Sequence, residues 1–192
     1  MAKRISASFI TRSAVLLALV LLFQSLRIFF PALALIPIGP TNLSSVLIGS
    51  LVNMTLVVAS MTVGFWGAAI VGLLATVVSF LQGFMPPVPA MIFVIAVGNA
   101  IIAFVYRITS TRLKNSARLV FSVLCSSLAK FLFLFVSVQY LVIPFFVADR
   151  PPVAAVLSVA FGVQQLITAL IGSLTATLIL PSIQAALRKK GE

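Results

Sequence analysis

The sequence contains no histidine, only two acidic residues, Asp149 and Glu192, and a single cysteine, Cys125. General acid–base catalysis therefore lacks its usual groups. One cysteine cannot form an internal disulfide, and it has no histidine or cysteine partners for a structural metal site. The phosphate-binding, zinc-protease and nucleophile-elbow motifs are also missing. We expect neither an enzyme nor a bound cofactor.

Charge is scarce as well. Only 8% of the 192 residues are charged, whereas 62% are hydrophobic. A soluble domain of this length needs a more polar surface, so the composition indicates a polytopic membrane protein. The formal net charge of +11 could suggest nucleic-acid binding. However, the basic residues lie between or beyond long apolar runs, which is typical of membrane flanks.

Six apolar runs approach the roughly 20 residues that a spanning helix needs. They are continuous and do not alternate with polar residues, which favours helices over strands. We predict an all-α protein with one transmembrane domain over residues 1–192. The predicted spans are Ser8–Phe30, Leu43–Val63, Phe65–Phe80 (reaching Gly83), Ala90–Tyr106, Arg118–Ile143 and Val153–Leu187, the last interrupted near Pro181.

The basic residues are distributed unevenly between the two sides of such a bundle. With six spans, both termini lie on one side, and ten of the thirteen basic residues lie there too. These ten are Lys3, Arg4, Arg12, Arg107, Arg112, Lys114, Arg118, Arg188, Lys189 and Lys190. Arg27 and Arg150 lie towards the opposite side. The positive-inside rule then predicts a cell-membrane protein with cytoplasmic N- and C-termini.

The start of the chain has an alternative interpretation. Lys3 and Arg4, followed by AVLLALVLLF and then Ala32 and Ala34, resemble a secretory signal. Against cleavage, the apolar segment continues to Phe30, and Arg27 lies just before the site. Removing this segment would also leave five spans and place the basic tail on the wrong side.

One charged residue, Lys130, lies inside an apolar run, LCSSLAKFLFLFV. It is about twelve residues from the basic end of its span, or ~18 Å at ~1.5 Å per residue, near the midplane of the membrane. A lysine there costs about 2.5–3.5 kcal/mol on insertion scales, so its serine-bearing face should point into the bundle. Polar residues of other spans lie at similar depth or nearer the outer surface: Asn53, Asn99, Gln164, Gln165, Gln82, Gln24 and Arg27. Their depths predict a polar cavity open to the outside.

These polar residues also have a purely structural interpretation. Amide and hydroxyl side chains in spanning helices often join helices together. Lys130 could bond backbone carbonyls, lose its proton, or extend towards an interface. Asp149 could pair with Arg150 or with Arg27, leaving Lys130 without a carboxylate. If Lys130 instead faces the cavity, it would meet a carboxylate or the ring carbonyls of a substrate.

Small residues recur at a spacing of four in two spans. Ala14 and Ala18 do so in the first span, and Gly64, Ala68 and Gly72 do so in the third. Such residues let another helix approach closely. In the third span we expect internal packing. In the first, small residues that face lipid would form a docking surface.

With these features the chain resembles the S components of energy-coupling factor (ECF) transporters, the substrate-binding subunits of prokaryotic vitamin importers. The similar features are the size, the six spans and the segment SAVLLALVLLF with Ala14 and Ala18. The proline-marked segments FFPALALIPIGPTN, GFMPPVPAM and VADRPPVA also look like the outer loops of that family.

The resemblance implies a substrate site near the outer face and docking on a transmembrane coupling protein driven by two ATPase subunits. We predict Lys130, Asn99, Gln164, Gln82, Arg27 and Asn53 as substrate-binding residues, and Ala14 and Ala18 as docking residues. The substrate would be a small vitamin or related micronutrient, with no subfamily signature to specify which. A stand-alone secondary carrier or channel, and a membrane assembly protein without a ligand, are the alternatives.

Overall fold

The computed structural model describes residues 7–85, 87–113 and 117–189. Its helices are α1 (Ala7–Phe29), α2 (Leu43–Thr62), α3 (Phe65–Leu81), α4 (Ala90–Arg112), α5 (Arg118–Ser137), α6 (Ile143–Phe146), α7 (Pro151–Ala160) and α8 (Val163–Lys189), with a 3-10 turn η1 (Pro31–Leu35) and a π turn η2 (Val138–Val142). Two short strands, β1 (Pro37–Ile38) and β2 (Thr41–Asn42), pair as an antiparallel hairpin after η1. The predictions for Lys3, Arg4, Lys114, Lys190 and Glu192 concern residues outside the described ranges.

The helices confirm the predicted membrane architecture. In the part of the chain that the structure describes, five segments are long and apolar enough to cross a membrane: α1, α2, α4, the run from α5 to α6, and the run from α7 to α8. The sixth, α3, is an apolar helix of 17 residues. At ~1.5 Å per residue it is about 25 Å long, which covers most of a roughly 30 Å hydrocarbon core. The chain is a multi-pass helical membrane protein.

Two predicted helix ends and one predicted break need correction. The fourth span continues beyond Tyr106 to Arg112. The fifth does not stop before Pro144, because η2 joins α5 to α6 and the helix passes through the proline. In η2 the amide of Ile143 bonds the carbonyl of Val138, five residues earlier. The wider turn accommodates a ring that would clash with the carbonyl four residues earlier in a regular α-helix.

The sixth span is interrupted at Phe161 and Gly162, and not near Pro181, which lies exposed inside α8. A side chain at Gly162 would lie 2.9 Å from the carbonyl oxygen of Ser158, so the turn requires glycine there. The break leaves the carbonyl of Ala160 without its helical partner, and the Gln165 side chain donates to it at 3.2 Å. A backbone break inside a membrane needs such compensation.

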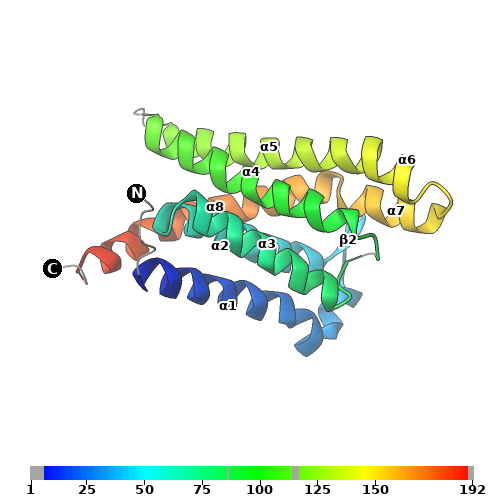
Figure 1. Cartoon of the computed structure of the whole chain (residues 1–192), viewed down its shortest axis with the longest axis horizontal. Coiled ribbons are helices and arrows are strands. Elements are labelled where there is room, and N and C mark those ends of the chain that lie inside the picture. The colour runs from blue at the N-terminus through cyan, green and yellow to red at the C-terminus, as the bar shows by residue number, and fades with distance from the viewer. Residues whose placement is uncertain (1–6, 86, 114–116, 190–192) are drawn as a thin grey trace.

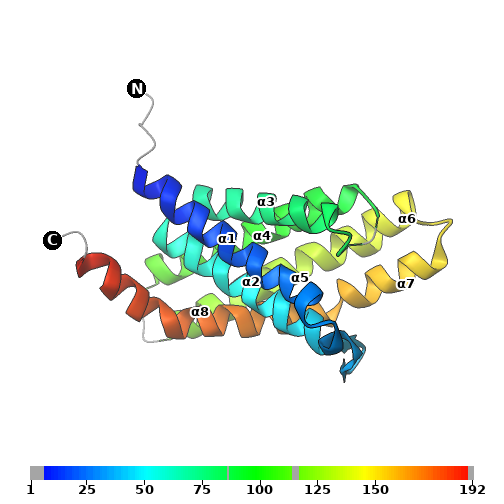
Figure 2. The same ribbon diagram turned by 90° about the horizontal axis from the view of Figure 1, so that it is seen from below.

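The bundle has two distinct ends, which Figures 1 and 2 show from two sides. The beginning of α1, the end of α4, the beginning of α5 and the end of α8 lie together at one end. The β1–β2 hairpin, the loop between α3 and α4, and the turn between α6 and α7 lie at the other. We call these the terminal end and the loop end. Helix α2 packs against α1, α3, α4 and α8 and contributes Leu56 and Val57 to the main core cluster.

Glycines bring the helices of this bundle into near contact. At Gly172 of α8, an added side-chain carbon would lie 2.5 Å from the Ser50 carbonyl oxygen and 2.6 Å from Cβ of Asn53. At Gly72 of α3, it would lie 3.0 Å from Cβ of Asn99. Ala68 and Gly72 are buried, which confirms internal packing for that part of the third span, whereas Gly64 precedes α3 with φ of 100°. These contacts set the positions of two membrane-buried amides.

Candidate functional site

A cavity of about 310 Å³ opens among the helices at the loop-end half of the bundle. Its residues towards the loop end are Arg27 in the last turn of α1, Ser45 in the first turn of α2, and Phe84 in the loop after α3. Its floor holds Lys130, twelve residues into α5. Roughly 300–1,000 Å³ is typical of small-molecule pockets, so the space fits a small compound.

The ammonium group of Lys130 is held by two amide oxygens from different helices. Its Nζ atom donates to Oδ1 of Asn53 on α2 at 2.6 Å and to Oδ1 of Asn99 on α4 at 2.8 Å. The side chain is only 4% exposed, so it does not extend to an interface. A lysine ammonium has three N–H donors. Among the described residues two are used, so the third has no described partner, and Lys130 lines the cavity.

The Asn99 amide is oriented by a threonine of α3. The Thr76 hydroxyl donates to the Gly72 carbonyl at 2.7 Å, so its oxygen lone pairs remain free to accept. Nδ2 of Asn99 donates to that hydroxyl at 3.2 Å and to the Gly72 carbonyl at 3.4 Å. With the amino group bound there, the amide oxygen must face Lys130.

The Asn53 amide is oriented in the same way from α8. The Thr168 hydroxyl donates to the Gln165 carbonyl at 3.2 Å and accepts from Nδ2 of Asn53 at 3.5 Å. Both asparagines therefore bind the lysine with their oxygens and a threonine with their amino groups. We call Lys130, Asn53, Asn99, Thr76 and Thr168 the lysine clamp. It joins five helices around one buried charge.

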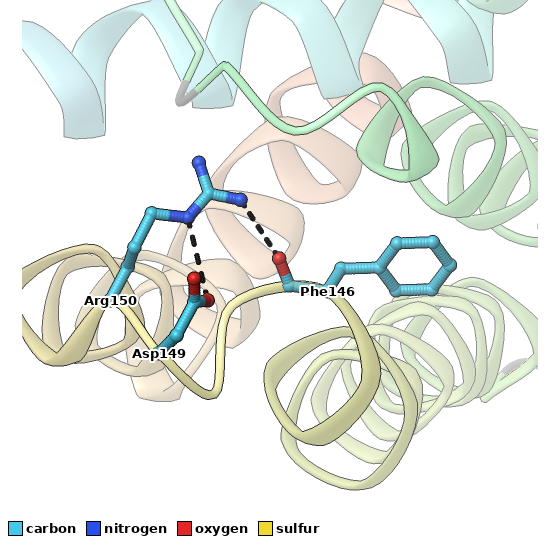
Figure 3. A network of polar contacts seen from close by, with 3 residues as sticks. All are labelled: Phe146, Asp149 and Arg150. Carbon is cyan, nitrogen blue, oxygen red and sulfur yellow. Dashed lines mark hydrogen bonds and ion pairs between the residues drawn. The ribbon is translucent and has the colours of Figure 1, made fainter.

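No acidic side chain among the described lining residues neutralises this charge. Asp149 lies in the turn between α6 and α7, where its Oδ1 is 3.8 Å from Nε of Arg150 (Figure 3). Arg150 also donates to the carbonyl of Phe146 at 2.9 Å. Asp149 is exposed, so the expected pairing with Arg150 occurs at the surface and leaves Lys130 without a carboxylate.

Two side chains of α1 line the cavity from the side. Nη1 of Arg27 donates to the Phe84 carbonyl at 3.0 Å, and its guanidinium carbon lies 5.5 Å from the centre of the Phe84 ring, a cation–π distance. Nε2 of Gln24 donates to the Ala75 carbonyl at 3.2 Å. The other amide atom, Oε1 of Gln24, is buried and has no hydrogen-bond partner among the described residues.

Five of the six predicted substrate-binding residues line this cavity: Lys130, Asn53, Asn99, Gln164 and Arg27. The sixth, Gln82, does not; it is exposed and follows the last residue of α3. The helix ends at Leu81, so helical periodicity no longer determines the direction of the Gln82 side chain. The contribution of these residues to binding stays a prediction.

The cavity also contains residues that the sequence did not single out, namely Thr76, Ser79, Ser45, Phe84 and Phe161. Thr76 and Ser79 are three residues apart in an otherwise apolar helix. Polar residues at that spacing share a helix face, so the pair could have been recognised. Phe84 and Phe161 have no such signal, because aromatic residues are frequent throughout this chain.

Ala14 and Ala18 are both exposed on α1. Only Val20 and Gln24 of this helix are fully buried. Helix α1 therefore directs a polar residue into the cavity and two small residues to the outside of the bundle.

A family model described as "ECF transporter, substrate-specific component" matches residues 8–187 of the chain. No curated protein and no solved structure matches it.

The lysine clamp predicts a measurable coupling between Lys130 and Asn99. Asn99→Leu removes one of two acceptors of a buried ammonium, and we expect it to lower the free energy of unfolding by about 1.5–3 kcal/mol. Adding Lys130→Met removes the donor too, so the double variant should regain part of that loss. The measurement is thermal unfolding of the wild type, both single variants and the double variant in one detergent, with Gln82→Leu as a control outside the cavity. Strictly additive losses would contradict the interaction.

Proposed function

The chain belongs to the family of ECF transporter substrate-specific components, and we propose that it binds a small water-soluble vitamin or related micronutrient in the Lys130 cavity. Its role is to present this compound to an ATP-driven importer. Binding, and not catalysis, is the activity of the site.

One observation carries the proposal: a buried ammonium with an unused donor at the floor of a cavity of suitable size. Polar groups in a membrane interior are costly, and the lysine clamp offsets that cost only in part, because it supplies neutral acceptors. A purely structural lysine would need no cavity beside it. Gln164 and Arg27 offer further donors from α8 and α1.

We assign docking to α1. Ala14 and Ala18 form a flat, exposed strip on this helix, where a helix of a coupling protein can approach closely. An apolar groove of about 420 Å³, lined by residues of α1, α2 and α8 that include Val15, Leu19 and Ile183, adjoins the same helix in the terminal half. The partner is a transmembrane coupling protein with two ATPase subunits.

The basic residues support an orientation with the terminal end in the cytoplasm. Arg12, Arg107, Arg112, Arg118 and Arg188 belong to the helix ends that gather there (Figure 1). By the positive-inside rule this end is cytoplasmic, and the cavity at the loop end then faces the outside, from which a nutrient arrives.

The first test is the small-molecule content of the purified protein. We expect mass spectrometry of the denatured wild type to release one compound in near-stoichiometric amount. Lys130→Met should bind the compound about 10- to 150-fold more weakly and so retain less of it, because a charge-assisted hydrogen bond contributes about 1.5–3 kcal/mol and 1.4 kcal/mol is tenfold. Gln82→Ala, a polar change outside the cavity, should retain the wild-type amount. Equal recovery from all three proteins would contradict the proposed site.

The second test separates docking from binding. Replacing Ala14 and Ala18 together by leucine should abolish uptake of that compound into cells, because bulky side chains prevent close helix approach. Binding by the isolated variant should remain, since the strip lies outside the cavity. Val163→Leu, at another exposed position, is the control. Parallel loss of binding and uptake would instead assign the alanines to folding.

The third test concerns orientation. Reporter fusions after Lys114 and at the C-terminus should both indicate the cytoplasm, because the ten basic residues bias these segments to that side. A fusion in the turn after Ala148 should report the outside. An external C-terminus would overturn the orientation and the direction in which the cavity opens.

A further inference from the structure

The charge of Lys130 is a stricter constraint on the substrate than its unused N–H. Both acceptors of the ammonium are neutral amide oxygens, at 2.6 and 2.8 Å. They satisfy hydrogen bonds but contribute no negative charge. An isolated charge in a low-dielectric interior is costly unless a counter-ion neutralises it. A neutral carbonyl would be a third acceptor of the same kind and would leave the charge uncompensated.

The second cation of the cavity adds to this constraint. Arg27 lines the same space, and none of the described lining residues is acidic. Asp149 is the one acidic residue that the structure describes, and it lies with Arg150 in the exposed turn between α6 and α7. The protein thus offers two positive groups to the cavity and no described negative one. An anionic substrate supplies what the lining lacks.

Gln24 indicates a second feature of the substrate, a hydrogen-bond donor. Its side chain is 8% exposed and lines the cavity, and its Oε1 atom accepts no hydrogen bond from the described residues. The amino group of the same amide is held by the Ala75 carbonyl at 3.2 Å, so the amide cannot turn over without losing that bond. Buried acceptors without a partner are rare, and one inside a binding cavity matches a donor on the ligand.

Apolar side chains also line the cavity. Ile48, Val52, Ile95 and Phe161 give the cavity an apolar wall. Their side chains offer contact surface and no hydrogen bonds.

We infer that the substrate is a small carboxylic acid whose carboxylate binds Lys130 and which also carries a neutral N–H or O–H group that donates to Oε1 of Gln24. This inference rests on the proposed function and specifies the substrate class of the same cavity. It excludes cations, and it excludes amides and esters of the same acid as good substrates.

The experiment starts from the compound released by the denatured wild-type protein. Treatment with a methylating reagent should convert it to a methyl ester, and deuterium exchange should reveal a labile hydrogen besides that of the carboxyl group. The acid and its methyl ester then form a matched pair that differs in charge at one group. Where nothing is released, 4-hydroxybenzoate and 4-hydroxybenzamide, which share a neutral O–H donor and differ in the carboxylate, replace them as probes in thermal unfolding.

Titration of this pair against four proteins tests each contact. The wild type should prefer the acid at least tenfold, and Lys130→Met should lose the preference. Asn99→Asp places a carboxylate beside Lys130 in nearly the same shape, so it should fold well yet bind the acid at least tenfold more weakly. Gln24→Met should weaken acid and ester equally, because the donor contact is independent of the carboxylate.

The outcomes separate this inference from the function on which it rests. A released compound without a carboxyl group, or equal binding of acid and ester by the wild type, overturns the inference that the substrate is a carboxylate. The proposal that the cavity binds a substrate remains in either case. If Gln24→Met binds the acid as tightly as the wild type does, the inferred contact between the substrate donor and Gln24 is overturned. If nothing is released and 4-hydroxybenzoate stabilises the wild type no more than 4-hydroxybenzamide does, the inference of a carboxylate is overturned and the proposed function loses its support.

Discussion

The structure depends on how one ammonium group is kept inside a membrane. Lys130 is 4% exposed, and its described partners are two amide oxygens from α2 and α4. Those amides are fixed by threonines of α8 and α3, whose hydroxyls donate to backbone carbonyls. Each bond in this series determines the orientation of the next. The result is a polar core that joins five helices and leaves one donor of Lys130 without a described partner beside a cavity.

Close helix packing makes this arrangement possible. Gly172 brings α8 against α2 beside Asn53, and Gly72 brings α3 against Asn99. A larger residue at either position would separate the helices and lengthen the hydrogen bonds around the lysine. Small residues in membrane helices often serve packing alone. Here they also position the polar groups, so the packing and the site cannot be separated.

Helix α1 links the cavity to the outer surface of the bundle. Gln24 and Arg27 attach it to the backbone of α3 and of the following loop, and both also line the cavity. Ala14 and Ala18 lie exposed on the same helix. A ligand that contacts Gln24 or Arg27 would therefore act on the element proposed for docking. If α1 docks as proposed, recognition and coupling share one helix.

The sequence by itself determined the membrane environment, the six apolar helices, the uneven distribution of basic residues and the positions of Lys130, Asn53 and Asn99 along their helices. These follow from the chain alone because lipid limits which residues can lie where, and helical rise converts position into depth. Depth does not specify direction. Only the tertiary structure decided that Gln82 is exposed, that Thr76 and Thr168 orient the amides, and that the last span breaks at Gly162. Each of these depends on how a helix is rotated and where it ends, and contacts between distant segments set both.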